Sequence, residues 1–379
     1  MSITGSNPLE WDDDTWARVV ISTVCAADAG AAQLVHQVGA VAALEHLRTS
    51  RDGVDAQVKS IPWLHTREAA AHHIAQLAQP CGVLVPTDEQ WPTPLNDLPV
   101  APVALWWRGH GDISALLRKS VAIVGARAAT GYGTRIAATM AADLAAAHWT
   151  VISGGAFGID AAAHRGALTG APVISVLACG VDISYPMAHH DLFARIANDG
   201  LLLSETGLGQ PARRYHFLSR NRIIAALARG TVVVEAAHRS GSLSTARVAL
   251  ELGRPVMAVP GPVTSQASAG THELLRVCPD VQLVTSAEHV REMCAVVGEE
   301  MCAIPDGPSG AIDSLSPDAA RVLDHMSKTS ADVALVAQRA HVSVPHALAA
   351  LAELNVAGLV VDTATGWALT SQGMAPSPR

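Results

Sequence analysis

The sequence has no motif for a metal site, a redox centre or a membrane span. Its six cysteines are scattered over 379 residues without a C-x-x-C pair or a Cys/His cluster, which argues against a zinc site and a redox motif. No apolar stretch reaches the roughly 18 residues that cross a membrane. The acidic start MSITGSNPLEWDDD lacks the basic and apolar parts of a secretory signal. We therefore expect a cytoplasmic protein with buried, reduced thiols and no membrane partner.

Positive charge is also scarce over the chain as a whole. There are 26 Lys and Arg against 34 Asp and Glu, which gives a formal net charge of -8. Proteins that coat duplex DNA by bulk electrostatics are usually basic throughout, so that class is disfavoured. The length and a hydrophobic content of 49% predict two or three globular domains. A nucleic-acid site in this chain has to be a local basic patch.

Phenylalanine and tyrosine are rare and confined to one part of the chain. All three Tyr and all three Phe lie between positions 132 and 217. The overlapping segment 206–234 contains no Asp or Glu but holds five arginines, Arg213, Arg214, Arg220, Arg222 and Arg229. Aromatic rings interleaved with arginine are typical of single-stranded nucleic-acid binding. Two plainer interpretations stay open: the arginines form a solvated helix face, and the rings pack in the largest core.

The apolar pattern changes twice along the chain. Residues 12–78 show helical spacing, and from Val83 to Gly109 short β-rich runs are separated by proline. Beyond them, apolar strands alternate with helices of about 10 to 15 residues. Strands are predicted at 120–124, 150–153, 172–178, 201–204, 231–235 and 255–259. Repeated βα units with continuous Val, Ile and Leu strands predict a parallel sheet covered on both faces, hence an α/β, Rossmann-like doubly wound core.

The C-terminal part is predicted to form a separate winged-helix domain. Ser316 caps a helix at 317–327, Ser330 and Ser343 are interpreted as caps of two more helices, and the segment after Gly358 predicts a two-stranded wing. The predicted boundaries are 1–80 for an N-terminal helical domain of SAM or helix-hairpin-helix type, 81–298 for the core, 299–311 for a linker, 312–371 for the winged helix and 372–379 for a disordered tail.

Three loops of small residues follow predicted strands at the carboxyl edge of the sheet. They are GARAATGYG at 125–133, SGGAFG at 153–158 and SGS at 240–242. Ligands of open parallel sheets bind at this edge, where helix N-termini present unpaired N–H groups. The loops together predict an anion site suited to phosphates. The P-loop and the dinucleotide fingerprint are both absent, so we expect no cofactor and no metal.

Five linear motifs add a family resemblance. S-G-G-A-x-G-I-D-x-x-A-H-x-x-A-L lies at 153–168, R-N-R-I-I-A-x-L at 220–227, V-V-V-E-A at 232–236, S-G-S-L-x-T-A at 240–246 and G-R-x-V-x-A-V-P-G at 253–261. In this order and spacing they resemble the DNA-processing protein A (DprA/Smf) family. The resemblance implies a homodimeric, single-stranded DNA-binding recombination mediator rather than an enzyme. Such a protein protects incoming strands and loads the RecA recombinase in natural transformation or related recombination.

The resemblance also implies which residues bind DNA. They are Arg127, Ser153, Gly154, Gly155, Arg220, Asn221, Arg222, Ser240, Gly241 and Ser242. Arginine forks hold phosphates, and backbone amides receive the next phosphate. The chain departs from the family motifs at Met187, His189, Leu218 and His272. The base missing beside Tyr185 is expected to weaken DNA binding, and the two histidines either compensate in part or are ordinary surface residues.

Two other functions stay open. Nucleoside-monophosphate phosphoribohydrolases share the architecture, but aligning their P-G-G-x-G-T-x-x-E motif on Thr245 puts Val248 at the catalytic Glu. A nucleotide-sensing winged-helix transcription factor needs a basic recognition helix, whereas VPHALAALAELN contains no Lys or Arg. Asp160 and His164, an i,i+4 pair, and Glu235 are interpreted as structural groups rather than acid–base catalysts.

Overall fold

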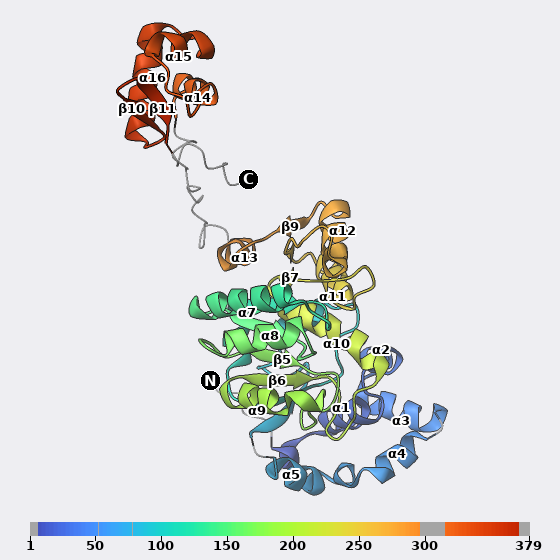
Figure 1. Ribbon diagram of the computed structural model, residues 1–379. Helices are drawn as coiled ribbons and strands as arrows, with labels where there is room; N and C mark the ends of the chain where they lie inside the picture. Colours follow the sequence, from blue (N-terminus) through green and yellow to red (C-terminus); the bar gives the residue numbers. More distant parts are fainter. Residues whose placement is uncertain (1–6, 52, 78, 296–314, 371–379) are drawn as a thin grey trace. The chain divides into compact units, whose positions relative to one another are not determined.

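The computed structural model describes residues 7–51, 53–77, 79–295 and 315–370. The chain divides into two compact units, Met1–Cys302 and Ala303–Arg379 (Figure 1). The predicted linker at 299–311 and tail at 372–379 lie outside the described residues, and the predicted domain boundaries stay predictions. None of the helices within the described ranges is long and apolar enough to cross a membrane.

Short helices form the beginning of the first unit, as the spacing of residues 12–78 predicts. They are α1 (Asp13–Val24), α2 (Ala29–Val38), α3 (Ala40–Ser50), α4 (Val54–Ser60) and α5 (Arg67–Ala75). The side chains of Asp12 and Asp28 cap α1 and α2 by accepting backbone N–H bonds at 2.7 and 2.9 Å. Gly39, between α2 and α3, has φ of +82°, which favours glycine. Apolar side chains of these helices share a buried cluster with one face of the sheet.

A nine-stranded sheet lies at the centre of the first unit. Its strands are β1 (Cys81–Leu84), β2 (Leu105–Gly109), β3 (Ser120–Val124), β4 (Thr150–Ser153), β5 (Ile174–Val176), β6 (Leu201–Ser204), β7 (Thr231–Val233), β8 (Val256–Ala258) and β9 (Val281–Leu283). Their spatial order is β1-β2-β6-β5-β4-β3-β7-β8-β9. The neighbouring pairs β1–β2 and β2–β6 are antiparallel. The six other neighbouring pairs of the spatial order are parallel. The predicted α/β fold class is confirmed.

The six predicted strands are all present, and three are shorter than predicted. The segments 172–178, 231–235 and 255–259 contain β5, β7 and β8, whose flanking residues belong to the loops. The segment with β-rich runs and prolines forms β1 and β2. Strand β9 was not predicted, because only Val281 of its three residues is buried. A single buried residue gives no apolar run to read in the sequence.

Alternate residues of the central strands pack against opposite faces. Val121 and Ile123 of β3 lie in a buried cluster with α7 (Gly131–Ala146), α8 (Ile159–Ala167) and α9 (His190–Asp199). Ala122 and Val124 lie in a second cluster with α10 (Arg214–Leu227) and α11 (Ser242–Glu251). Burial on both faces accounts for the continuous apolar strands. The remaining helices of this unit within the described ranges include α6 (Ile113–Arg118), α12 (Ala269–Val277) and α13 (Ala287–Cys294).

The strand order reverses at β3. From β3 the chain proceeds to β4, β5 and β6 on one side and then returns to β7, which pairs with β3 on the other side. The loops after β3 and β7 therefore leave the carboxyl edge of the sheet next to each other. Open parallel sheets bind ligands at such a switch point.

The second unit is a winged helix, as predicted. It consists of α14 (Pro317–Asp324), α15 (Val333–Ala340), α16 (Val344–Val356) and the antiparallel strands β10 (Val360–Thr363) and β11 (Gly366–Leu369). Ser316 and Ser343 cap α14 and α16 as expected. The prediction for Ser330 is wrong, because Asp332 caps α15 by accepting a 2.8 Å bond from Leu335 N. The Ser330 hydroxyl instead bonds to a hydroxyl in the turn of the wing.

Candidate functional site

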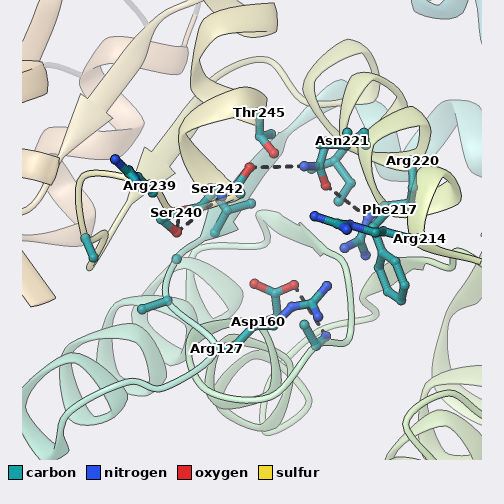
Figure 2. A pocket seen from close by; sticks show the side chains of 18 residues that line it. Arg127, Asp160, Arg214, Phe217, Arg220, Asn221, Arg239, Ser240, Ser242 and Thr245 are labelled. Atoms are coloured by element: carbon teal, nitrogen blue, oxygen red, sulfur yellow. Dashed lines mark hydrogen bonds between the residues drawn. The ribbon is translucent and has the colours of Figure 1, made fainter.

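A cavity of about 650 Å³ lies at the switch point of the sheet. Its walls come from the loops after β3, β4 and β7, from α10 and from the start of α11. Figure 2 shows Arg127 and Asp160 on one wall, the Ser240–Ser242 turn on a second, and Asn221 with Arg220 on a third. We call this cavity the switch-point pocket.

The switch-point pocket is positively charged. Arg127, Arg214 and Arg239 line it and are exposed to solvent. Arg220 also lines the pocket, but from a buried position. Among the described lining residues, Asp160 is the acidic one. Burial raises the pKa of the Asp160 carboxyl, which the Arg220 guanidinium opposes. Four guanidinium groups against one carboxyl make the pocket suited to an anion with several charges.

Arg220 holds two strands of the site together. It is 5% exposed, and its Nη1 donates to Gly154 O at 2.6 Å and to Val176 O at 2.9 Å. These carbonyls belong to the loop after β4 and to β5. A Cβ at Gly154 would lie 1.7 Å from this guanidinium nitrogen, so the SGG turn needs glycine there. Arg220 therefore determines the shape of the pocket wall.

Asp160, at the start of α8, fixes the same turn. Its Oδ2 accepts bonds from Gly154 N at 3.2 Å and Ala156 N at 3.4 Å. The expected Asp160–His164 pair is replaced by these bonds to the turn. His164 is fully buried, and burial lowers its pKa to about 3, so the ring is neutral at pH 7. Asp160 supports the loop through these bonds, and the His164 ring lies buried in the interior.

An aromatic group borders the pocket next to Arg127. The Arg127 guanidinium carbon lies 4.6 Å from the centre of the Phe217 ring, a cation–π contact. The Phe217 ring centre lies 5.6 Å from that of Tyr185. Tyr185, Phe157 and Tyr215 are each about half exposed, at 48%, 49% and 49%. These rings come from the loop after β4, the loop after β5 and α10, and they offer solvent-facing surfaces for stacking.

The other two rings are used differently. Phe193 is 2% exposed and packs in the core, and the Tyr132 hydroxyl donates to Pro260 O at 2.7 Å. Core packing therefore accounts for Phe193, and nucleic-acid stacking by the exposed rings stays a prediction. Four of the six rings lie on or beside the segments that line the pocket.

The SGS turn is held rigid by Asn221. The Asn221 Nδ2 donates to Gly241 O at 3.1 Å and to Ser244 Oγ at 2.8 Å. The hydroxyls of Ser240 and Ser242 lie 2.7 Å apart. Helix α11 begins at Ser242, so its first backbone N–H groups carry partial positive charge at the pocket. Ser240, Gly241 and Ser242 all line the pocket, as does Asn221.

Four of the predicted site residues lie outside the lining. Ser153 is fully buried, and its Oγ donates to Ile123 O at 2.6 Å. Gly154 O accepts a hydrogen bond from Arg220. Gly155 has φ of +68°, and a Cβ at this position would clash with the Phe193 ring. Arg222 pairs with Glu205 and donates to Val100 O at 2.7 Å. These residues position the lining, and a direct DNA contact from them stays a prediction.

Arg214 and Arg239 line the pocket but were not predicted as site residues. Arg214 lies within the segment 206–234, whose lack of Asp and Glu indicated a basic region but did not single out this residue. Arg239 lies outside that segment, immediately before the SGS turn. In the sequence, only its position directly before the SGS turn indicates that Arg239 belongs to the site.

The positions that depart from the family motifs have distinct surroundings. Met187 and Leu218 are 72% and 64% exposed. His189 is not a surface residue, because it is 4% exposed and its Nδ1 lies 3.0 Å from Gly155 O. His272 is half-buried, with Nε2 3.0 Å from Gly261 O. The two histidines brace loops of the site.

Glu235 also braces a loop, as expected. It is 1% exposed and accepts bonds from Thr130 N at 2.9 Å and Thr130 Oγ1 at 2.6 Å. These bonds hold the loop between β3 and α7. Within the described ranges, no group of His, Cys, Asp and Glu side chains is arranged to hold a metal ion.

The fold and the pocket define a Rossmann-like domain with a basic cavity at its switch point, accompanied by a winged helix. A family model described as DNA recombination-mediator protein A matches residues 82–295, and a model described as the DprA winged helix domain matches 307–364. The chain belongs to the DprA/Smf family.

Known relatives match over most of the chain. A putative DNA processing protein DprA of Mycobacterium tuberculosis is 38% identical over 90% of both chains. The X-ray structure of DprA from Streptococcus pneumoniae has a TM-score of 0.59 and 31% identity, and the match covers 78% of this chain and 100% of that one. A Helicobacter pylori DprA structure, described by its single-stranded DNA binding mode, has a TM-score of 0.50 and 30% identity over 56% of this chain and 94% of that one.

Proposed function

We propose that this protein binds single-stranded DNA in the switch-point pocket and acts as a recombination mediator without catalysing a reaction. The observation that supports this most is the combination of three exposed arginines, Arg127, Arg214 and Arg239, with half-exposed rings beside them. Guanidinium groups hold phosphates, and rings stack on unpaired bases. A duplex buries its bases and leaves the rings without a partner.

The finer roles follow from family membership. We propose that the protein works in the cytoplasm as a homodimer, protects single strands and loads RecA on them in natural transformation or related recombination. The relative from Helicobacter pylori, whose single-stranded DNA binding mode has been described, supports the choice of nucleic acid. Within this assignment, Arg220, Asn221 and Arg222 mainly position the groups that touch DNA.

A mobility-shift comparison tests the proposal. Single-stranded and duplex oligonucleotides of the same sequence are titrated with the full chain at two salt concentrations. The single strand should bind more tightly, and its affinity should fall as salt rises because counterions are released from phosphates. Equal binding of both forms, or binding that salt does not weaken, contradicts the proposal.

A further inference from the structure

A second basic cavity lies at the opposite edge of the same strands. Its volume is about 450 Å³, and its lining includes Arg118, Lys119, His148 and Arg229. Arg118 and Lys119 precede β3, His148 precedes β4 and Arg229 precedes β7. The carboxyl ends of these three strands lead into the switch-point pocket. We call this second cavity the amino-edge pocket.

The charge of the amino-edge pocket differs from that of the chain as a whole. Among the residues that the structure describes, its lining contains three Lys or Arg and no Asp or Glu, in a chain with 34 acidic and 26 basic residues. Arg118, Lys119 and Arg229 are exposed. Arg229 Nη1 donates to Arg118 O at 2.9 Å, which fixes the guanidinium in the cavity wall. Among the residues that the structure describes, neither Arg118 nor Arg229 forms an ion pair. The cavity therefore attracts anions.

The described lining recognises charge, and its exposed ring is the small imidazole of His148. Its large aromatic residue, Trp149, is 1% exposed, so the indole face is not available for stacking. This contrasts with the half-exposed rings at the switch-point pocket. Guanidinium and ammonium groups that have no exposed Phe, Tyr or Trp ring beside them bind phosphate groups independently of base identity.

We propose that the amino-edge pocket is a second phosphate-binding site, which holds the backbone of the DNA strand beyond the part bound at the switch-point pocket. The inference rests on the proposed function. Strand β3 has five residues, so the two edges are separated by roughly 17 Å or more. A short oligonucleotide fills one pocket, and only a longer strand reaches both.

The test compares short and long strands on the full chain. The variant Arg118→Gln/Arg229→Gln is titrated with oligonucleotides of about 3 and about 30 nucleotides, which bracket the roughly 4 to 16 nucleotides of common single-strand sites. Binding of the short strand should not change. The long strand should bind more weakly, and its log affinity versus log salt slope should decrease in magnitude by about 1.4, since each lost contact removes about 0.7.

Two controls separate charge from folding. Arg118→Lys/Arg229→Lys keeps the charge and should retain the salt slope of the parent. Arg135→Gln removes an exposed arginine of α7 that lines neither pocket and should bind both strands like the parent. Melting temperatures of all variants are measured alongside. Weaker binding of short and long strands in equal proportion contradicts the proposal, because it indicates damage to the switch-point pocket.

Two further results also contradict it. Unchanged long-strand binding by the glutamine variant removes the second site from the DNA path. If, in addition, inorganic pyrophosphate raises the melting temperature of the parent but not of that variant, the cavity holds small free phosphates instead of DNA. A parent chain that binds neither strand refutes the proposed function itself. That outcome is distinguishable from the results above, in which the parent chain still binds DNA.

Discussion

The guanidinium carbon of Arg127 lies 4.6 Å from the centre of the Phe217 ring, so a positive charge and an aromatic ring meet at one point of the pocket. Arg127 follows β3, and Phe217 belongs to α10 on the far side of the cavity. The contact holds an exposed arginine over the pocket before any ligand binds. It is worth about 0.5–1 kcal/mol at an exposed site.

Arg127→Ala should weaken single-stranded DNA binding with little effect on stability. The change removes about one phosphate contact, which decreases the magnitude of the log affinity versus log salt slope by roughly 0.7. Titrations at several salt concentrations measure the slope, and thermal melting verifies the fold. An Arg127→Ala protein that folds normally and binds with the affinity and slope of the parent shows that the pocket is wrongly assigned.

Arg220→Ala should destabilise the fold instead. It breaks two hydrogen bonds from a buried charged group to Gly154 O and Val176 O, and such bonds are worth roughly 1.5–3 kcal/mol each, so we expect a loss of about 3 kcal/mol. Arg222→Ala should also lower the melting temperature, because Glu205 loses its ion pair. Denaturant unfolding measures the loss of free energy, and thermal melting measures the change in melting temperature. Parent-like stability of Arg220→Ala would mean that the guanidinium is held for DNA rather than for the fold.

The difference between Arg127 and the Arg220–Arg222 motif shows what the sequence could and could not predict. The acid-free segment correctly located a basic region, and the Val, Ile and Leu runs located the strands of the parallel sheet. Charge counting does not give side-chain direction. Helix α10 turns Arg220 toward the sheet, Asn221 toward the SGS turn and Arg222 toward Glu205. Arg214 of the same helix lines the pocket and is exposed to solvent.

Residues that depend on tertiary contacts were the least predictable. His189 is buried against Gly155 and the rings of Phe157 and Phe193, and its contacts with Gly155 and Phe157 join parts of the chain that meet only in the fold. Arg239 becomes a pocket residue because β7 returns to the side of β3. A family motif located the loops, but only the fold determines which side chains line the cavity.

Met187→Lys should strengthen DNA binding. Met187 is 72% exposed and lies two residues after Tyr185, whose ring contacts Phe217 beside the pocket. A lysine there restores the base that family members often have near this position, at little cost in stability because the side chain is solvated. The salt slope should increase in magnitude by about 0.7. Met187→Gln provides the neutral control and should leave the slope unchanged; a gain with glutamine points to a cause other than charge.

The protein should not release free base from nucleoside monophosphates. In the phosphoribohydrolase pattern a glutamate occupies the position of Val248, a half-buried residue of α11 that cannot serve as a base or nucleophile. Chromatography of the incubation mixture measures the product. Release clearly above a protein-free blank, and lost in Arg127→Ala, restores the enzyme hypothesis for this pocket.

Stability should fall as the pH decreases below neutrality, in part because of His164. Burial lowers the pKa of this fully buried ring from 6.5 to about 3. Between these values the unfolded chain binds a proton at His164 that the folded chain does not, so the free energy of unfolding decreases as pH falls through 6.5 toward 3. Above pH 6.5 the group contributes no pH dependence. The slope from this one group approaches 1.36 kcal/mol per pH unit.

Urea unfolding at pH 7.5 and pH 5 measures this pH dependence of the free energy of unfolding. His164→Gln is the comparison, because glutamine does not titrate. If both proteins lose the same free energy between the two pH values, His164 is not held neutral by the fold.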